Sequence, residues 1–261
     1  MQILTLLNEK GGVGKTTQSV HIAAGLAITG QRVLLIDSDP QAHSTHQLRM
    51  KEFDGLLRLL AQDAQWKDVV FQPEQIWHSG DAKGTLFVMP SHNNIRALPM
   101  MLSNAWELRD RLSELSEMNV VDVVVIDTSP TPSLLHSMIY MATHWFLFPS
   151  ECASMSIDGL AKSTKHWKQA NEERKNRGIP GSQIMGIIPT MFRHNTTSHS
   201  ENLLSIQKHF GKLTWEPVTL RTIWEQASDV RRTLFSYAPG DVATVEAWNI
   251  VNQVQEKLVS V

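Results

Sequence analysis

The 261-residue sequence contains a single cysteine, Cys152, and no long uninterrupted apolar run. One cysteine excludes a disulfide within the chain and any cysteine-rich metal site, and it is typical of a protein of the reducing cytoplasm. Without about 18 consecutive apolar residues, no segment is expected to span a membrane. The apolar stretch within residues 1–8 is too short for a secretory signal peptide, so we expect a cytoplasmic protein.

A large net charge of one sign is also absent, because the formal net charge is −2. Residues 1–150 carry 11 basic and 15 acidic side chains, which gives −4, whereas residues 151–261 carry 13 and 11, which gives +2. A surface of this kind does not attract nucleic acid as a whole. DNA binding would therefore need a local basic patch, doubled by dimerisation.

The hydrophobic residues, 42% of the chain, suffice for a sizeable core, and they form short buried runs that alternate with helical patterns. This alternation predicts a mostly parallel, twisted sheet with helices on both faces, in a single α/β domain over residues 1–261. The expected strands are 3–7, 31–37, 85–90, 121–127, 144–149 and 184–189, and the expected helices are 16–27, 54–61, 93–117, 132–142, 156–174, 198–210 and 242–258.

A glycine-rich segment, Glu9–Thr17, stands between the first expected strand and the first expected helix. Glycines let backbone N–H groups crowd around phosphate oxygens, and a helix N-terminus adds positive potential. We expect Lys15 to reach the β- and γ-phosphates and the Thr16 hydroxyl to hold Mg²⁺. The expected phosphate-binding residues are Gly11, Gly12, Val13, Gly14, Lys15, Thr16 and Thr17. The alternative is a glycine-rich turn with two surface lysines.

The loop departs from the general phosphate-binding pattern, because Glu9 replaces the first glycine and Lys10 opens the loop. K-G-G-V-G-K-T-T resembles the deviant Walker A motif of the ParA/MinD family of P-loop ATPases, and Glu9 is similar to the ParA/Soj branch. The resemblance implies a P-loop NTPase fold, the cofactors ATP and Mg²⁺, and an ATP-dependent homodimer. It also implies two catalytic lysines, of which Lys15 serves its own nucleotide and Lys10 that of the partner.

Aspartates end two of the expected strands, where ligands of open α/β sheets bind. Asp127 resembles the Walker B aspartate, which would hold Mg²⁺ through a water, and Asp37–Ala42 resembles the family motif D-x-D-P-Q. The resemblance implies that Asp39 positions the attacking water and that Asp37 orients the outer shell of the metal. Helix caps or plain turns are the alternatives. Ser129 replaces a family proline after Asp127.

The last third of the chain carries the expected base and DNA contacts. Ile187–Phe192 resembles the family strand whose end borders adenine, which implies base contacts from Pro189 and Thr190. The resemblance to the ParA/Soj branch also implies DNA contacts from arginines in this part of the chain, here Arg193, Arg221, Arg231 and Arg232, with Trp224 where some relatives have a further arginine. The basic stretch Lys162–Arg177 is the alternative DNA surface, or else a solvated helix face.

The resemblance implies a slow, partner-stimulated ATPase that binds DNA non-specifically and partitions plasmids or chromosomes with a ParB-type protein. One alternative is a nucleoid-bound ATPase that positions a protein cargo. Another is a MinD-like membrane ATPase, which the few basic residues of 251–261 disfavour. A third is a metabolic ligase similar to dethiobiotin synthetase, which the early lysine disfavours. We expect no preceding helix-turn-helix domain, and we interpret His43 and His46 as loop histidines.

Overall fold

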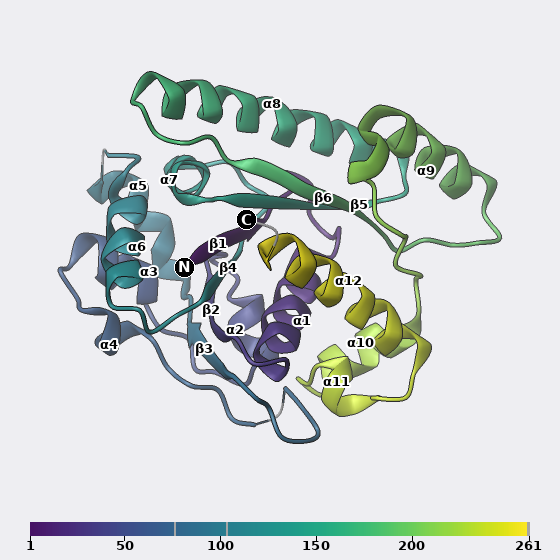
Figure 1. Ribbon diagram of the computed structural model, residues 1–261, viewed down its shortest axis with the longest axis horizontal. Coiled ribbons are helices and arrows are strands. Elements are labelled where there is room, and N and C mark those ends of the chain that lie inside the picture. Colours follow the sequence, from purple (N-terminus) through teal and green to yellow (C-terminus); the bar gives the residue numbers. More distant parts are fainter. Residues whose placement is uncertain (76, 103, 260–261) are drawn as a thin grey trace.

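A six-stranded parallel sheet lies at the centre of the fold in the computed structural model, which describes residues 1–75, 77–102 and 104–259 (Figure 1). The strand order is β3-β2-β4-β1-β5-β6, and all the paired strands run parallel. The strands are β1 (Gln2–Leu6), β2 (Arg32–Asp37), β3 (Thr85–Met89), β4 (Val123–Asp127), β5 (Trp145–Glu151) and β6 (Gln183–Thr190). This confirms the predicted single-domain α/β fold with a parallel sheet.

The strands are apolar throughout because both faces of the sheet are covered. Successive residues alternate between faces: Val125 of β4 packs in the cluster with α1 (Lys15–Ile28) and α12 (Val242–Val259), whereas Val124 packs in the opposite cluster. Helices α3 (Gly55–Ala61), α6 (Glu107–Glu117) and α7 (Leu134–Ala142) contribute to that second cluster. Figure 1 shows α8 (Ser154–Asn176) running along β6 and β5, followed by α9 (Thr197–Phe210).

Helices α1 and α12 lie side by side because one residue of α1 has no side chain. A Cβ atom on Gly25 would lie 2.5 Å from Cγ2 of Val251. Glycine at this position therefore allows the two helices to approach closely, which fixes the helix that follows the phosphate-binding loop.

The register of the central strands places the two predicted carboxylates next to each other. Asp37 at the end of β2 is the neighbour of Asp127 at the end of β4, and Leu6 at the end of β1 is paired with Asp127 on the other side. The loop after β1 and both aspartates therefore meet at one edge of the sheet.

Several expected boundaries differ from the structure. The expected helix 93–117 is divided into a 3₁₀ helix η1 (Asn93–Ala97), a short α5 (Leu98–Met101) with a proline in its first turn, and α6. Proline is tolerated in the first turn of a helix, but in the interior of a helix it would remove a backbone N–H donor. One continuous helix through this proline is therefore disfavoured. Strand β6 includes Pro189, which an outermost strand tolerates.

Short helices lie in segments where no helix was expected, together with a second 3₁₀ turn η2 (Gly211–Leu213). They are α2 (His43–Gln47), α4 (Trp66–Val69), α10 (Thr222–Asp229) and α11 (Leu234–Tyr237). Among the described residues, no helix is both long and apolar enough to span a membrane.

Candidate nucleotide-binding site

The loop between β1 and α1 has the backbone of a phosphate cradle. Gly12 and Gly14 adopt left-handed conformations with φ of 75° and 85°, which favour glycine. Asn8 fixes the start of the loop, since its Nδ2 donates to the Pro149 carbonyl at 2.8 Å and its Oδ1 accepts from the Lys10 N–H at 3.0 Å. Helix α1 begins at Lys15, so the unpaired N–H groups of its first turn are available to an anion.

Lys15 is held inside the loop that it is expected to serve. The residue is 6% exposed, and Nζ donates to the Lys10 carbonyl at 3.0 Å. Burial lowers the pKa of Lys15, while the nearby charges of Asp127 and Asp39 raise it. The ammonium group therefore lies close to both predicted carboxylates.

Buried hydroxyl groups surround the carboxylates of Asp37 and Asp127. Asp127 accepts from Oγ of Ser19 at 3.1 Å and from Oγ of Ser44 at 2.6 Å. Asp37 accepts from N and Oγ1 of Thr45 at 2.9 and 2.7 Å. Burial, with the neighbouring Asp127 as the second cause, raises the pKa of Asp37 to about 7, and burial also raises the pKa of Asp127.

The oxygen atoms of Thr16, Asp127 and Asp37 fit a hard divalent cation, since Mg²⁺ prefers oxygen ligands and usually keeps waters and phosphate oxygens in its shell. Within the described part of the chain, no group of three or more histidine, cysteine, aspartate or glutamate side chains could hold a metal by itself. A cation here would therefore rely on one or two carboxylates together with a ligand.

A cleft of about 670 Å³ opens in front of the loop. Asp39, a residue that is 7% exposed, borders this cleft, and its Oδ1 accepts from the Gln41 N–H at 2.9 Å. Arg96 and Arg231 also line this cleft. The phosphate-loop residues that line it are Gly11, Gly12, Gly14, Lys15, Thr16 and Thr17.

The loop after β4 has its own support where Ser129 replaces the expected proline. Ring atom Nε2 of His136 lies 3.0 Å from the Ser129 carbonyl, and Nδ1 lies 3.3 Å from Oγ of Ser133. Burial lowers the pKa of His136. A neutral ring that donates from Nε2 can then hold the loop beside the cleft.

A family model described as an AAA domain matches residues 1–179. The chain belongs to this family.

Curated relatives and a solved structure agree with the family model. The chromosome-partitioning ATPase Soj of Thermus thermophilus is 27% identical over 239 residues, which cover 90% of this chain and 88% of the relative. The chromosome partitioning protein ParA of Caulobacter vibrioides is 25% identical over 230 residues, covering 85% and 82%. An ATP complex of a Cyanothece McdA variant has the same fold, with a TM-score of 0.81, 20% identity, and coverage of 100% of this chain and 97% of that one. The predicted resemblance to the ParA/Soj P-loop ATPases is thus confirmed.

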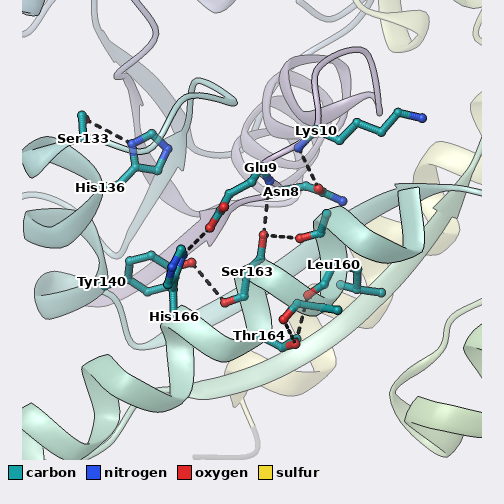
Figure 2. A network of polar contacts seen from close by, with 12 residues as sticks. Asn8, Glu9, Lys10, Ser133, His136, Tyr140, Leu160, Ser163, Thr164 and His166 are labelled. Carbon is teal, nitrogen blue, oxygen red and sulfur yellow. Dashed lines mark hydrogen bonds and ion pairs between the residues drawn. The ribbon is translucent and has the colours of Figure 1, made fainter. Parts of the chain in front are cut away.

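Lys10, expected to act on a partner's nucleotide, forms an ion pair within this P-loop ATPase chain. Its Nζ lies 2.9 Å from Oε2 of Glu151 at the end of β5. Figure 2 shows its side chain extending away from Glu9, whose carboxylate points toward His166 of α8. The Glu9 N–H also donates to Oγ of Ser163 at 3.2 Å, so α8 holds the start of the loop.

The predicted DNA-binding arginines do not lie in one environment. Arg193, Arg231 and Arg232 are exposed, and Arg231 also lines the phosphate cleft, whereas half-buried Arg221 pairs with Glu246 at 3.4 Å. In the alternative basic stretch, Arg174 is 3% exposed and donates to backbone carbonyl groups, including that of Thr143 at 2.5 Å. Arg174 is therefore a buried anchor and not part of a surface.

The predicted base-contact residues take different positions. Thr190 ends β6 beside the loop, where its Oγ1 donates to the Val13 carbonyl at 2.9 Å. Pro189 uses its carbonyl to accept from the Val218 N–H at 2.8 Å.

The sequence alone did not identify Ser19, Ser44 and Thr45 as partners of the carboxylates. The hydroxyl residues following D-x-D-P-Q were the available signal for the last two.

Proposed function

We propose that this P-loop ATPase is an ATP-dependent dimerising switch, which binds DNA non-specifically and partitions plasmid or chromosomal DNA with a ParB-type partner. The observation that carries the proposal is a phosphate loop with buried Lys15 beside Asp39 and Asp127, opened by a second lysine, Lys10. The partitioning names of relatives that match over most of their length support it. Such a protein would act in the cytoplasm, on the nucleoid.

Each part of the cleft has a defined task in this proposal. The glycine N–H groups and Lys15 would bind the phosphates, and Asp39 would position the attacking water next to the γ-phosphate. Thr16 would hold Mg²⁺ directly, Asp127 through a water, and Asp37 would orient the outer shell. The bound Mg²⁺ supplies charge neutralisation at the phosphates. The hydroxyl groups of Ser44 and Thr45 donate to Asp127 and Asp37 and hold those two carboxylates in place. Asp39 lies beside the cleft.

Lys10 makes the dimer part of the catalytic site. A cation from a partner subunit can stabilise charge that develops on the transferred phosphoryl group, as an arginine finger does. In the isolated chain, Lys10 pairs with Glu151. Dimerisation would replace this pair with the partner's phosphates, which links hydrolysis to assembly.

Lys10→Ala tests this step. The variant should bind ATP with the parent affinity in calorimetry, because Lys15 and the loop N–H groups remain. Light scattering should show loss of the ATP-dependent dimer, and phosphate release should fall. Normal dimerisation together with normal turnover would remove the proposed role of Lys10.

DNA binding is the output of the cycle, and one experiment tests the whole proposal. Binding to a random duplex should be measured with ATP, with ADP and without nucleotide, each at two salt concentrations. ATP should be required, because two copies of Arg193 can act together only in a dimer, and salt should weaken binding because the contacts are to phosphates. If ATP confers no DNA binding, the switch serves another purpose.

A further inference from the structure

One face of α8 holds the residues that precede the phosphate-binding glycines. Gly159, Ser163 and His166 are spaced i, i+4 and i+7, which places them on the same side of the helix. A Cβ atom on Gly159 would lie 2.7 Å from Oδ1 of Asn8, so only a glycine allows this close approach. Oγ of Ser163 accepts from the Glu9 N–H at 3.2 Å, and Nδ1 of His166 hydrogen-bonds to Oε1 of Glu9 (Figure 2). Helix α8 therefore contacts both the backbone and the side chain of Glu9.

The carboxylate of Glu9 is buried and depends on His166. The exposed fraction of the side chain is 8% for Glu9 and 43% for His166. Among the side chains that the structure describes, His166 alone hydrogen-bonds to this carboxylate. An ionised carboxylate only accepts hydrogen bonds, so Nδ1 of His166 must carry a hydrogen and donate it. Because a buried carboxylate without a donor is strongly disfavoured, Glu9 keeps its inward position only while His166 donates to it.

The position of Glu9 affects the direction of Lys10, the next residue. Glu9 turns toward α8, and the Lys10 side chain extends the other way (Figure 2). The Lys10 N–H donates to Oδ1 of Asn8 at 3.0 Å, and its Cβ would lie 3.2 Å from a Cβ atom on Gly159. The base of the lysine side chain is thus held against α8, while Nζ reaches Glu151. A group that acts on a partner's nucleotide contributes only if its position is fixed in this way.

A hollow of about 300 Å³ beside the Glu9–His166 pair contains the other groups that can affect its charge. His136 and Tyr140 line this hollow from α7, and Glu173 lines it from α8. Burial lowers the pKa of His136, whereas burial, with the charge of Glu9 as the second cause, raises the pKa of Tyr140. Both groups are therefore uncharged at neutral pH. Among the described residues that line the hollow, His166 is thus the one that can balance the carboxylates with a positive charge.

We propose that His166 is a positioning residue for Lys10: by holding the Glu9 carboxylate against α8, it aligns the lysine with the nucleotide of a partner subunit. The inference rests on the proposed function, because it requires Lys10 to act in the dimer. A protonated ring binds the carboxylate as an ion pair, whereas a neutral ring offers one weaker hydrogen bond. Histidine side chains titrate between about pH 5 and 8, so ATP-dependent dimerisation should weaken as the pH rises from about 6 to about 8.

The dimer dissociation constant with ATP tests this role at pH 6 and pH 8. Sedimentation velocity measures it in an Asp39→Ala background, which prevents loss of ATP. His166→Ala and Glu9→Gln should each raise the constant about tenfold at pH 6, the scale of one hydrogen bond to a charged group. Each should also remove most of the difference between the two pH values. His209→Ala on α9 and Glu172→Gln on α8, both exposed, are matched controls and should behave as the parent does.

Two further measurements separate positioning from a structural role. The double variant should be no worse than either single variant, because the two residues act through one contact; additive effects would overturn the inference. The calorimetric affinity for ADP should be unchanged in both variants, because Lys15 and the glycine N–H groups remain. A matching loss of ADP affinity would show that the pair only supports the loop, which would also overturn the inference.

The unmodified protein distinguishes this inference from the proposed function. A parent dimer that is equally stable at pH 6 and pH 8, or unaffected by His166→Ala, would overturn the inference alone. No ATP-dependent dimer at either pH would overturn the proposed function as well. If His166→Ala does not fold, Glu9→Gln and the pH dependence of the parent decide.

Discussion

Replacing Glu151 with glutamine should strengthen ATP-dependent dimerisation, although Glu151 itself lies outside the phosphate cleft. In the single chain its carboxylate pairs with Lys10 at 2.9 Å, with side-chain exposures of 27% for Lys10 and 30% for Glu151. In the proposed dimer Lys10 serves the partner's nucleotide, so the pair must break first. Removing the carboxylate lowers the cost of that rearrangement.

The size of the effect follows from the exposure of the pair. A partly solvated ion pair contributes about 0.2–1 kcal/mol. A dimer breaks two copies, which amounts to about 0.4–2 kcal/mol, or a factor of about 2–30 in the dimer dissociation constant. The gain should shrink at high salt, because screening weakens the pair in the parent protein.

Sedimentation velocity with ATP measures the dissociation constant, and an Asp39→Ala background prevents loss of ATP during the run. Glu201→Gln, on the exposed surface of α9, is the matched control. A dissociation constant that is unchanged or larger in Glu151→Gln would refute the reasoning, because it would mean that Glu151 does not compete for Lys10.

Four further predictions follow from the site. Lys15→Ala should abolish tight ATP binding in calorimetry; an unchanged affinity would show that the loop does not hold the phosphates. Asp39→Ala should give a persistent ATP-bound dimer with little phosphate release, and hydrolysis at the parent rate would contradict the role of its carboxylate. Arg193→Glu with Arg221→Glu should abolish DNA binding but keep dimerisation, and surviving DNA binding would favour the basic stretch on α8. Neutral substitution of either arginine should reduce the slope of log affinity for DNA against log salt concentration by about 0.9 for every phosphate that the arginine no longer neutralises. Because the pKa of Asp37 is raised from 3.8 to about 7 in the folded chain, its contribution to stability is complete below about pH 4 and lost as the pH rises through about 7. Over this pH range the melting temperature of Asp37→Asn should therefore fall less than that of the parent protein, and equal falls would contradict the raised pKa.

The sequence predicted the phosphate loop because its determinants are local. Glycine at positions 12 and 14 suits a left-handed backbone, and the helix that follows starts at Lys15, one residue before the expected start at Thr16. The continuous apolar strands likewise reflect burial on both faces of the sheet. The meeting of Asp37 and Asp127 could be anticipated in outline, since parallel strands end at one edge, but their direct pairing depends on the strand order, which no local pattern encodes.

The parts that could not be predicted depend on contacts between distant segments. The roles of Ser19 and Ser44 follow from the position of α1 and α2 relative to Asp127, which lies more than 80 residues away in both cases. The segment around Trp224 reaches the first turn of α1 through His21, a contact formed by packing across the molecule. Neither relation leaves a periodic or motif signal in the sequence.

The distribution of arginines shows how this limits functional prediction. The family resemblance suggested one DNA-binding group, yet half-buried Arg221 lines a smaller hollow beside the phosphate cleft. Arg231 is exposed and lines the phosphate cleft, whereas Arg193 and Arg232 are exposed and line neither hollow. A DNA contact by Arg221 would have to replace its pair with Glu246. The exposed arginines carry no such constraint. Coupling between ATP and DNA within one subunit would therefore pass through Arg231, which lines the phosphate cleft, or through Arg221, while Arg193 and Arg232 would depend on ATP through dimerisation.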